Sequence, residues 1–236
     1  MAIYVSSDLH GYPLSDFLKN LKQTGFCDED WLYILGDVID RNGDGGVEML
    51  RWLLYQPNVV LLRGNHEQML LDCAWLFENI TEESIDELDE DKMKLYARWQ
   101  MNGCAPTIES MKRLLHSDEE TALDILDYLG ETPLCETLEV GGRAFVLCHG
   151  GFKGFDKGKR LSDYDTFDIV WNRPLPTDRY FDDAITIIGH TMTDRYGCPE
   201  RAFHTETWID IDVGGSVGRP PMLLRLDDMK EFYFDR

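Results

Sequence analysis

Short apolar runs alternate with longer amphipathic stretches through the first third of the chain. The apolar runs lie at Ile3–Ser7, Trp31–Leu35 and Val59–Leu62, and each is followed by a stretch long enough for a helix. Runs of this length are typical of strands, and strands that alternate with helices form parallel sheets. We therefore expect repeated β-α units, with ligands bound by the loops at the carboxyl ends of the strands.

The pattern changes between about residues 78 and 130. This region is acidic and poor in β-branched runs, and its amphipathic spacing predicts three helical segments at Ile80–Gln100, Thr107–Leu115 and Glu119–Leu129. We interpret it as a helical insertion or cap within the α/β pattern.

Strand character returns after the insertion. Leu134–Val140 and Arg143–Cys148 flank Gly141-Gly142, a two-residue loop whose glycines tolerate the positive φ that a tight hairpin requires. Further strands are predicted at Ala184–Ile188, Thr207–Val213, Met222–Leu226 and Glu231–Phe234. A layered α/β fold with a mixed or paired sheet fits this order of elements best.

Length and charge restrict the function. A chain of 236 residues with 43% hydrophobic content suits one catalytic domain, residues 1–236, better than two. The net charge of -21 repels nucleic acids and anionic membranes, so we expect neither as a partner. Most of the acidic residues are expected to form a solvated surface.

The cysteine pattern predicts a reducing compartment. The six cysteines are scattered, with no C-x-x-C pair and no dense disulfide spacing. Met1 leads directly into a short apolar run without a basic segment or a long apolar segment, and no run is long enough to span a membrane. These features predict a cytoplasmic protein.

Polar, metal-binding side chains follow several of the predicted strands. They lie in five short segments: Ser7-Asp8-Leu9-His10-Gly11, Gly36-Asp37-Val38-Ile39-Asp40-Arg41, Gly64-Asn65-His66-Glu67, His149-Gly150-Gly151 and Gly189-His190-Thr191. Asp8 and His10 are two positions apart, so their side chains project to the same side of an extended backbone. Adjacent parallel strands lie about 5 Å apart, so ligands from three strand ends can converge on one site.

The donor types predict which metals bind and how many. Carboxylate, imidazole and amide oxygen without thiolate suit Mn²⁺, with Fe or Zn²⁺ as alternatives. Six donors (Asp8, His10, Asp37, Asn65, His149 and His190) can hold two divalent ions if one carboxylate bridges them. Asp37 is the natural bridge because of its central position. Two such ions, about 3.5–4 Å apart, hold a hydroxide and neutralise phosphate oxygens.

These segments together resemble the metallophosphoesterase superfamily, and specifically the phosphoprotein phosphatase family of serine/threonine phosphatases in its compact bacterial form. The family pattern G-D-x-H-G corresponds to Ser7–Gly11, G-D-x-x-D-R-G to Gly36–Asn42, and R-G-N-H-E is intact at Arg63–Glu67. The resemblance implies two mixed β-sheets flanked by helices. It also implies that Asp8 and His10 bind the first metal, that Asn65, His149 and His190 bind the second, and that Asp37 bridges them.

The resemblance also implies roles beyond metal binding. It identifies His66 as the acid that protonates the leaving oxygen, assisted by Asp40. Arg41 and Arg63 correspond to the arginines that bind the phosphate, since a guanidinium matches phosphate oxygens in a fork. Trp171-Asn172-Arg173 resembles a segment that carries a further phosphate-binding arginine, here Arg173.

The chain departs from the family pattern at two positions. Ser7 replaces the first glycine of G-D-x-H-G, and Asn42 replaces the glycine that follows Arg41. Asparagine adopts the left-handed conformation more readily than other non-glycine residues, so we expect Asn42 to keep this turn.

Several isolated features carry no functional prediction. His116 and His204 lie outside any motif and are expected at the surface or in packing. Gly214–Gly218 matches the nucleophile elbow G-x-S-x-G, but Pro220-Pro221 replace the helix that the elbow requires. Ser216 is therefore predicted to be a turn residue.

The sequence predicts a two-metal phosphomonoesterase in which a metal-bridging hydroxide attacks phosphorus directly. The resemblance favours a serine/threonine protein phosphatase, with a phosphorylated protein or small phosphoester as substrate. A dinucleoside-polyphosphate hydrolase of the diadenosine tetraphosphate type is the main alternative, and Glu67 favours the protein phosphatases over it. A non-catalytic phosphopeptide-binding module is the alternative from another class.

Overall fold

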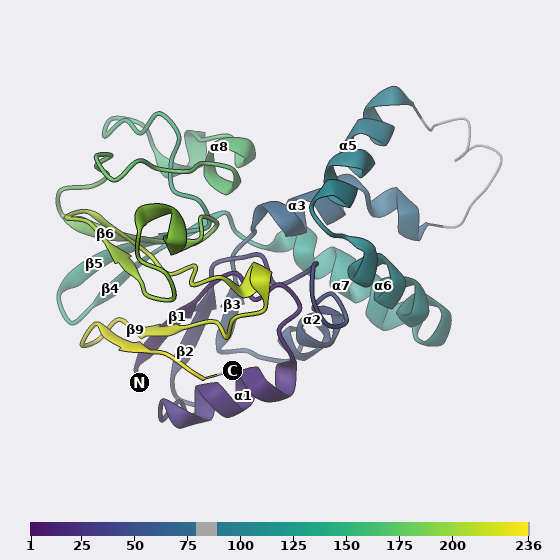
Figure 1. Ribbon diagram of the computed structural model, residues 1–236, viewed down its shortest axis with the longest axis horizontal. Coiled ribbons are helices and arrows are strands. Elements are labelled where there is room, and N and C mark those ends of the chain that lie inside the picture. The colour runs from purple at the N-terminus through teal and green to yellow at the C-terminus, as the bar shows by residue number, and fades with distance from the viewer. Residues whose placement is uncertain (79–88, 236) are drawn as a thin grey trace.

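The computed structural model describes residues 1–78 and 89–235, and strands within these ranges form two five-stranded sheets (Figure 1). The first sheet has the strand order β10 (Lys230–Phe232), β9 (Leu223–Arg225), β1 (Ile3–Ser6), β2 (Trp31–Ile34) and β3 (Val59–Leu61). The second has the order β4 (Cys135–Val140), β5 (Arg143–Cys148), β6 (Ala184–Ile188), β8 (Trp208–Asp210) and β7 (Phe203–His204).

Both sheets are mixed. In the first, β1, β2 and β3 are parallel, as the β-α pattern predicts, and β9 and β10 add antiparallel strands beside β1. In the second, β5, β6 and β8 are parallel, while β4 and β7 are antiparallel to their neighbours. The predicted hairpin forms: Val140 pairs with Arg143, and Gly141 and Gly142 have φ of 58° and 77°.

Alternation along the strands shows how the sheets are layered. Tyr4 pairs with Leu32 in the register of β1 and β2, and both side chains belong to a core that the first sheet shares with helices. The next pair, Val5 and Tyr33, belongs to a second core together with Leu147 of β5. Successive residues of a strand face opposite sides of a sheet, so the second core lies between the two sheets.

Helices cover the outer faces of both sheets. On the first sheet these are α1 (Leu14–Gln23), α2 (Val47–Leu53) and α3 (Asn65–Asp72). On the second sheet, α8 (Thr166–Val170) packs against β5 and β6 in a third core. The result is a helix, sheet, sheet, helix sandwich, which confirms the predicted fold class.

The helical insertion lies to one side of the sandwich (Figure 1). It contains η1 (Ala74–Phe77), α5 (Glu90–Met101), α6 (Ala105–Ser117) and α7 (Glu119–Glu131). The first part of the predicted helix Ile80–Gln100, residues 80–88, lies outside the described residues. Trp99, Met111 and Ile125 are fully buried in the same core as the helices of the first sheet. The insertion is therefore packed onto the helices of the first sheet.

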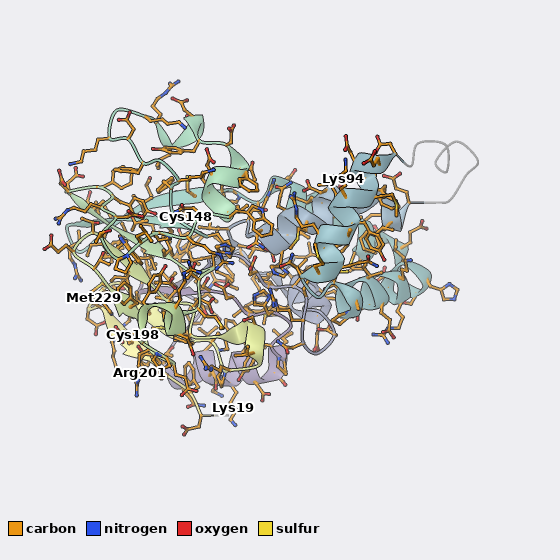
Figure 2. All side chains as sticks on the ribbon, turned by 45° about the horizontal axis from the view of Figure 1, so that its top comes forward. Lys19, Lys94, Cys148, Cys198, Arg201 and Met229 are labelled. Atoms are coloured by element: carbon orange, nitrogen blue, oxygen red, sulfur yellow. The ribbon has the colours of Figure 1, made fainter. Side chains whose placement is uncertain are left out.

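Charged side chains occupy the periphery, as Lys19, Lys94 and Arg201 illustrate in Figure 2, whereas Cys148 is buried. All six cysteines are free thiols, in line with the absence of a predicted disulfide framework. Among the described residues, no helix combines the length and the apolar character that are needed to cross a membrane.

Candidate metal centre

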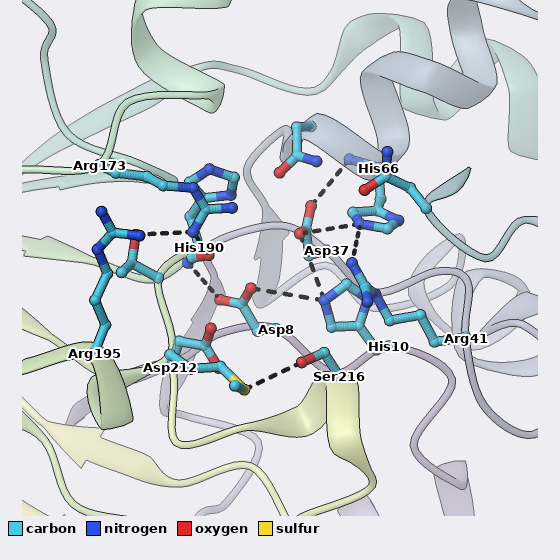
Figure 3. Close-up of a pocket in the computed structure, with 14 residues that line it drawn as sticks. Asp8, His10, Asp37, Arg41, His66, Arg173, His190, Arg195, Asp212 and Ser216 are labelled. Carbon is cyan, nitrogen blue, oxygen red and sulfur yellow. Dashed lines mark hydrogen bonds and ion pairs between the residues drawn. The ribbon is translucent and has the colours of Figure 1, made fainter. Parts of the chain in front are cut away.

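The predicted ligands lie just after parallel strands of both sheets, in loops or, for Asn65, at the first residue of α3. Asp8, Asp37 and Asn65 come after β1, β2 and β3, while His149 and His190 come after β5 and β6. Parallel strands present their carboxyl ends at one edge of a sheet. Because the two sheets stack, these two edges meet, and the ligand loops meet with them (Figure 3).

The ligand loops have an unusual backbone. Asp8, Asp37 and His190 have φ of 54°, 54° and 68°, and His10 has φ of 44°. Left-handed backbone at non-glycine residues costs energy and is concentrated at functional sites. Hydrogen bonds between loops hold it in place, including Asp8 N to the Gly36 carbonyl (3.1 Å) and His10 N to the Asp37 carbonyl (2.9 Å).

Gly189 permits close approach of the two sheets at this edge. A Cβ atom at this position would lie 1.9 Å from Ser7 Oγ and 2.2 Å from Asp8 Oδ2. The missing side chain lets the His190 amide reach Asp8 and donate to its Oδ2 at 2.9 Å. Any larger residue at 189 would push His190 away from the ligands of the first sheet.

Glu67 fixes the loop that carries Asp37. Its buried carboxylate accepts from the amides of Asp37 (2.8 Å), Val38 (2.8 Å) and Gly64 (2.9 Å). The side chain thus joins the loop after β2 to the start of α3. Glu67 points at backbone amides and does not line the cavity, so its contribution to substrate choice is indirect at most.

Two histidines are oriented by backbone carbonyls. His10 Nδ1 lies 3.0 Å from the Ile39 carbonyl, and His149 Nδ1 lies 2.6 Å from the Leu35 carbonyl. A carbonyl can only accept, so Nδ1 carries the proton and Nε2 of a neutral ring keeps its lone pair. This arrangement is typical of histidines that bind metals through Nε2.

Asp37 is shared by two clusters of candidate ligand atoms. One cluster is His10, Asp37 and His66, and the other is Asp37, His149 and His190. Asp37 Oδ2 lies 3.6 Å from His10 Nε2, and Asp37 Oδ1 lies 3.3 Å from His149 Nε2. The two oxygens thus face different histidines, as a carboxylate between two ions would.

Asp8 and Asn65 are the remaining predicted ligands, and each lies beside a histidine of one of the two clusters. Asp8 Oδ1 lies 3.8 Å from His10 Nε2, while its Oδ2 accepts from the Ser7 hydroxyl at 2.5 Å. Ser7, a departure from the family pattern, therefore supplies an additional donor to Asp8. Asn65 Oδ1 lies 3.0 Å from His149 Nε2. All six predicted ligands are buried and converge on one centre.

The electrostatics suit cation binding. Burial lowers the pKa of His10 to about 3, and burial with the positive field of His149 and Arg173 lowers the pKa of His190 well below its usual value. Both rings are therefore neutral. Burial alone would raise the pKa of Asp37, but the neighbouring imidazoles of His149 and His66 hold it well below its usual value, so Asp37 is an anion.

His149 shows that this half of the centre attracts positive charge. Burial opposes its protonation, yet the charge of Asp37, its hydrogen bond and the charge of Asp8 raise the pKa of His149 to about 9. His190 Nε2 is buried and has no hydrogen-bond partner among the described residues. An unpartnered buried nitrogen beside a carboxylate and an amide oxygen is satisfied by a metal ion, so the residues present fit the predicted divalent ions.

His66 and Asp40 form a buried pair beside the centre. His66 Nδ1 lies 2.6 Å from Asp40 Oδ2. Burial tends to lower the pKa of His66, but the charge of Asp37, with the hydrogen bond and charge of Asp40, raises it. The ring can therefore carry a proton on Nε2, which faces the cavity. His66 Nε2 is also 3.8 Å from Asp37 Oδ2, so the same ring borders the first ligand cluster.

The helical insertion holds Asp40 in place. Trp99 of α5 donates its indole N–H to Asp40 Oδ2 at 2.7 Å, and Thr107 of α6 donates its hydroxyl to Asp40 Oδ1 at 2.5 Å. Asp40 is fully buried and accepts from three side chains in all. These contacts have no local signal in the sequence, because Trp99 and Thr107 lie 59 and 67 positions from Asp40.

Two of the three predicted phosphate-binding arginines line the cavity. Arg41 Nη2 lies 3.4 Å from His66 Nε2, so both can donate to one oxygen placed between them. Arg173 lies on the opposite side of the cavity, where its Nη1 donates to the His190 carbonyl (3.0 Å) and to Thr191 Oγ1 (3.2 Å). These bonds use only Nη1, so within the described part of the chain Nη2 and Nε remain available for phosphate oxygens.

The structure corrects the prediction for Arg63. Its guanidinium points away from the cavity and donates to the carbonyls of Leu129 (3.2 Å), Gly130 (2.7 Å) and Thr132 (3.2 Å), which lie at the end of α7. It also donates to Gln68 Oε1 at 3.2 Å. Cations stabilise the carboxyl ends of helices, where carbonyls lack partners. Arg63 therefore joins the insertion to the catalytic part and does not bind phosphate here.

The expectation that Asn42 keeps this turn by adopting the left-handed conformation is also wrong. The left-handed residues of this turn are Asp40 and Arg41, with φ of 75° and 69°, and Asn42 is not among them. Asn42 acts through its side chain, whose Nδ2 donates to the carbonyls of His10 (2.9 Å) and Gly215 (3.1 Å). The residue thus joins three loops of the site.

The cavity also has lining residues that sequence analysis missed: Asn102, Thr191, Met192, Arg195 and Asp212, and Ser216, which was predicted to be only a turn residue. Asp212 follows β8, and burial with the nearby charge of Asp8 raises its pKa well above the usual value. The predicted strand Thr207–Val213 concealed it, since β8 ends at Asp210 and Asp212 is therefore a strand-end residue like the ligands. His116 and His204 are exposed, as expected.

Comparisons with known proteins identify the family and the fold. The family model for calcineurin-like phosphoesterases matches residues 1–205. The structure is similar to one described as a "putative diadenosine tetraphosphatase", with a TM-score of 0.62 and 13% identity over 98% of this chain and 91% of that one.

Two further solved structures have the same fold and different printed activities. One is a cold-active protein-tyrosine phosphatase of Shewanella, with a TM-score of 0.57 and 18% identity over 98% of this chain and 76% of that one. The other is a protein serine/threonine phosphatase from Saccharomyces cerevisiae, with a TM-score of 0.53 and 15% identity over 90% of this chain and 67% of that one. At these identities the likeness shows the fold alone.

Proposed function

The chain belongs to the calcineurin-like phosphoesterase family, and from that premise we propose that it is a two-metal phosphomonoesterase that acts on phosphoserine and phosphothreonine in proteins. Membership makes it a metal-dependent phosphoester hydrolase. The observation that carries the finer proposal is Asp37, whose two oxygens face separate histidine clusters beside the His66–Asp40 pair. This combination provides two ion positions and a proton donor at the same cavity.

The proposed ligands are Asp8 and His10 for one ion, Asn65, His149 and His190 for the other, with Asp37 between them. Imidazole, carboxylate and amide donors support Mn²⁺, with Fe or Zn²⁺ as alternatives. When bound, the two ions would activate a water molecule as the nucleophile and neutralise phosphate oxygens.

The remaining residues bind the substrate and transfer a proton. Arg41 and Arg173 donate to the phosphate oxygens from opposite sides of the cavity. His66 Nε2–H donates its proton to the leaving oxygen as the bond from phosphorus to that oxygen breaks. Asp40 holds Nδ1–H and stabilises the imidazolium before the transfer.

The size of the cavity supports a phosphorylated side chain as the occupant. Its volume is about 290 Å³, near the lower end of ligand sites, which span about 300–1,000 Å³. A phosphate on a single side chain fits this space, whereas most of a dinucleotide would lie outside it. The dinucleoside-polyphosphate hydrolase nevertheless stays the main alternative, because Glu67 points at backbone amides and no longer argues against it.

The test compares substrates on one manganese-loaded preparation: a phosphoserine peptide, a phosphotyrosine peptide and diadenosine tetraphosphate. We expect the highest kcat/KM on the phosphoserine peptide. An Asp37→Asn variant serves as the metal-centre control and should be inactive on all three. A clear preference for diadenosine tetraphosphate would overturn the protein-phosphatase proposal and leave the family assignment intact.

A further inference from the structure

Arg195 is a cation of the cavity that the proposed reaction does not use. It lies on the short helix η3 (Thr193–Tyr196) and lines the same cavity as the candidate ligands. Figure 3 shows it on the side of Arg173 and across the centre from Arg41. Its side chain is exposed at the rim, whereas the metal ligands are buried.

The charge of Arg195 is not neutralised by its neighbours. The adjacent acid, Asp194, forms a two-pronged ion pair with Arg219, at 2.6 and 3.1 Å. Glu200 also faces Arg219, at 3.4 Å. Within residues 1–78 and 89–235, no acceptor lies within hydrogen-bond or ion-pair distance of the Arg195 guanidinium. The chain has a net charge of -21 and 44 acidic residues, so an unpaired arginine at the rim of the cavity attracts anions locally.

The phosphate that is cleaved already has its donors. Arg41 adjoins the proton donor His66, and Arg173 is held at the centre by the His190 carbonyl and Thr191. Two guanidinium groups and two cations are sufficient for the three free oxygens of a phosphomonoester. Arg195 is therefore available to a different group of the same substrate.

We propose that Arg195 binds a second anionic group of the substrate, a carboxylate or a further phosphate, next to the phosphate that is cleaved. This inference rests on the proposed function of the cavity as a phosphoester site. It names a substrate class: phosphopeptides with an acidic neighbour or molecules with linked phosphates, in preference to isolated monoesters. An exposed ion pair of this kind changes affinity by about 1.5- to fivefold.

The experiment measures kcat and KM of Arg195→Gln on four substrates. Two are phosphoserine peptides that differ only in a glutamate or a glutamine beside the phosphoserine, and the others are diadenosine tetraphosphate and p-nitrophenyl phosphate. We expect the advantage of the glutamate peptide in kcat/KM to fall by about two- to fivefold, mainly through KM. Arg195→Lys should restore part of it, and high salt should narrow the difference.

Arg160→Gln is the matched control, because Arg160 is exposed, lies outside the cavity and carries the same charge. The inference is overturned if Arg195→Gln affects all four substrates equally, if it affects none, or if Arg160→Gln has the same effect. Failure of the proposed function gives a different result, namely no turnover of either peptide by the native protein. In that case the role of Arg195 is tested by comparing KM of Arg195→Gln for diadenosine tetraphosphate and for p-nitrophenyl phosphate. A rise in KM for diadenosine tetraphosphate alone supports the inference.

Discussion

Replacing His66 with asparagine separates proton transfer from metal binding. The His66 ring borders the first ligand cluster, but its Nδ1 is bonded to Asp40 at 2.6 Å and its Nε2 faces Arg41. The proposed ligands are other residues, so His66→Asn should retain both ions. It should lose activity only to the extent that the leaving oxygen needs a proton.

The magnitude depends on the substrate. A positioned acid contributes about 10²–10⁴-fold to rate, with the largest effect on a poor alkoxide leaving group. We therefore expect a loss of at least about 100-fold on a phosphoserine peptide. The phenolate of an aryl phosphate leaves readily without a proton, so p-nitrophenyl phosphate should lose roughly tenfold or less.

Asp40→Asn should reproduce this pattern more mildly. It removes the negative partner of His66 but leaves the ring in place. A hydrogen bond to a charged group contributes about 1.5–3 kcal/mol, which corresponds to about 10- to 100-fold in rate if it is fully used in the transition state. The pKa of His66 also falls without this charge, so the loss should grow as the pH rises.

The assay compares kcat on both substrates with the metal content of each variant. His116→Asn is the matched control, since His116 is exposed and distant in sequence from every motif. Equal losses on the two substrates, or the loss of an ion from His66→Asn, would refute the assignment. In that case His66 would be a ligand of the first cluster, where its Nε2 already lies 3.8 Å from Asp37.

Four further predictions address the rest of the structure. Manganese-loaded protein should contain two ions per chain by elemental analysis, and Asn65→Ala, which removes an amide oxygen from the second cluster, should contain fewer. Arg63→Gln should lower the free energy of unfolding by about 2 kcal/mol in urea, because helix-end carbonyls lose their donor, while kcat/KM changes about twofold or less. Trp99→Phe should reduce kcat on the phosphoserine peptide more than kcat on p-nitrophenyl phosphate, because the aspartate partner of the acid loses an N–H donor. Iodoacetamide should label exposed Cys27 in the folded protein but not Cys73, whose pKa is raised by burial to about 12, and mass spectrometry after digestion would detect a labelled Cys73.

The ligand set was predictable from sequence because it depends on strand ends. Asp8, Asp37 and Asn65 each follow a short apolar run, and parallel strands bring their carboxyl ends to one edge. Backbone direction accounts for the convergence of these side chains, whereas their assignment to two ions rests on the family resemblance and stays a prediction. The division into two sheets came from the family resemblance and not from the hydrophobic pattern, because β1 and β2 are apolar on both faces and the two cores they separate are visible only in the structure.

What sequence could not provide is the direction of individual side chains and the contacts between distant segments. Arg63 lies two positions before the predicted ligand Asn65, yet its guanidinium turns toward the end of α7, because that helix end packs there. Asp212 was hidden because the predicted strand runs to Val213, three residues beyond the end of β8 at Asp210. The support of Asp40 by Trp99 depends on how the insertion docks, which amphipathic spacing does not specify.

The division of the site between two sheets has a consequence for how a newly made chain acquires its metals. Asp8 accepts from the His190 amide across 182 positions, and Asp37 faces His149. A nascent chain that has emerged only through β3 and α3 carries Asp8, His10, Asp37 and Asn65, but it lacks both histidines of the second sheet. Contacts of such long sequence separation form late in folding. With the proposed ligand set, all six side chains are present only after His190, two residues beyond β6, has emerged from the ribosome and the second sheet has docked. Loading of the complete site would then follow most of translation.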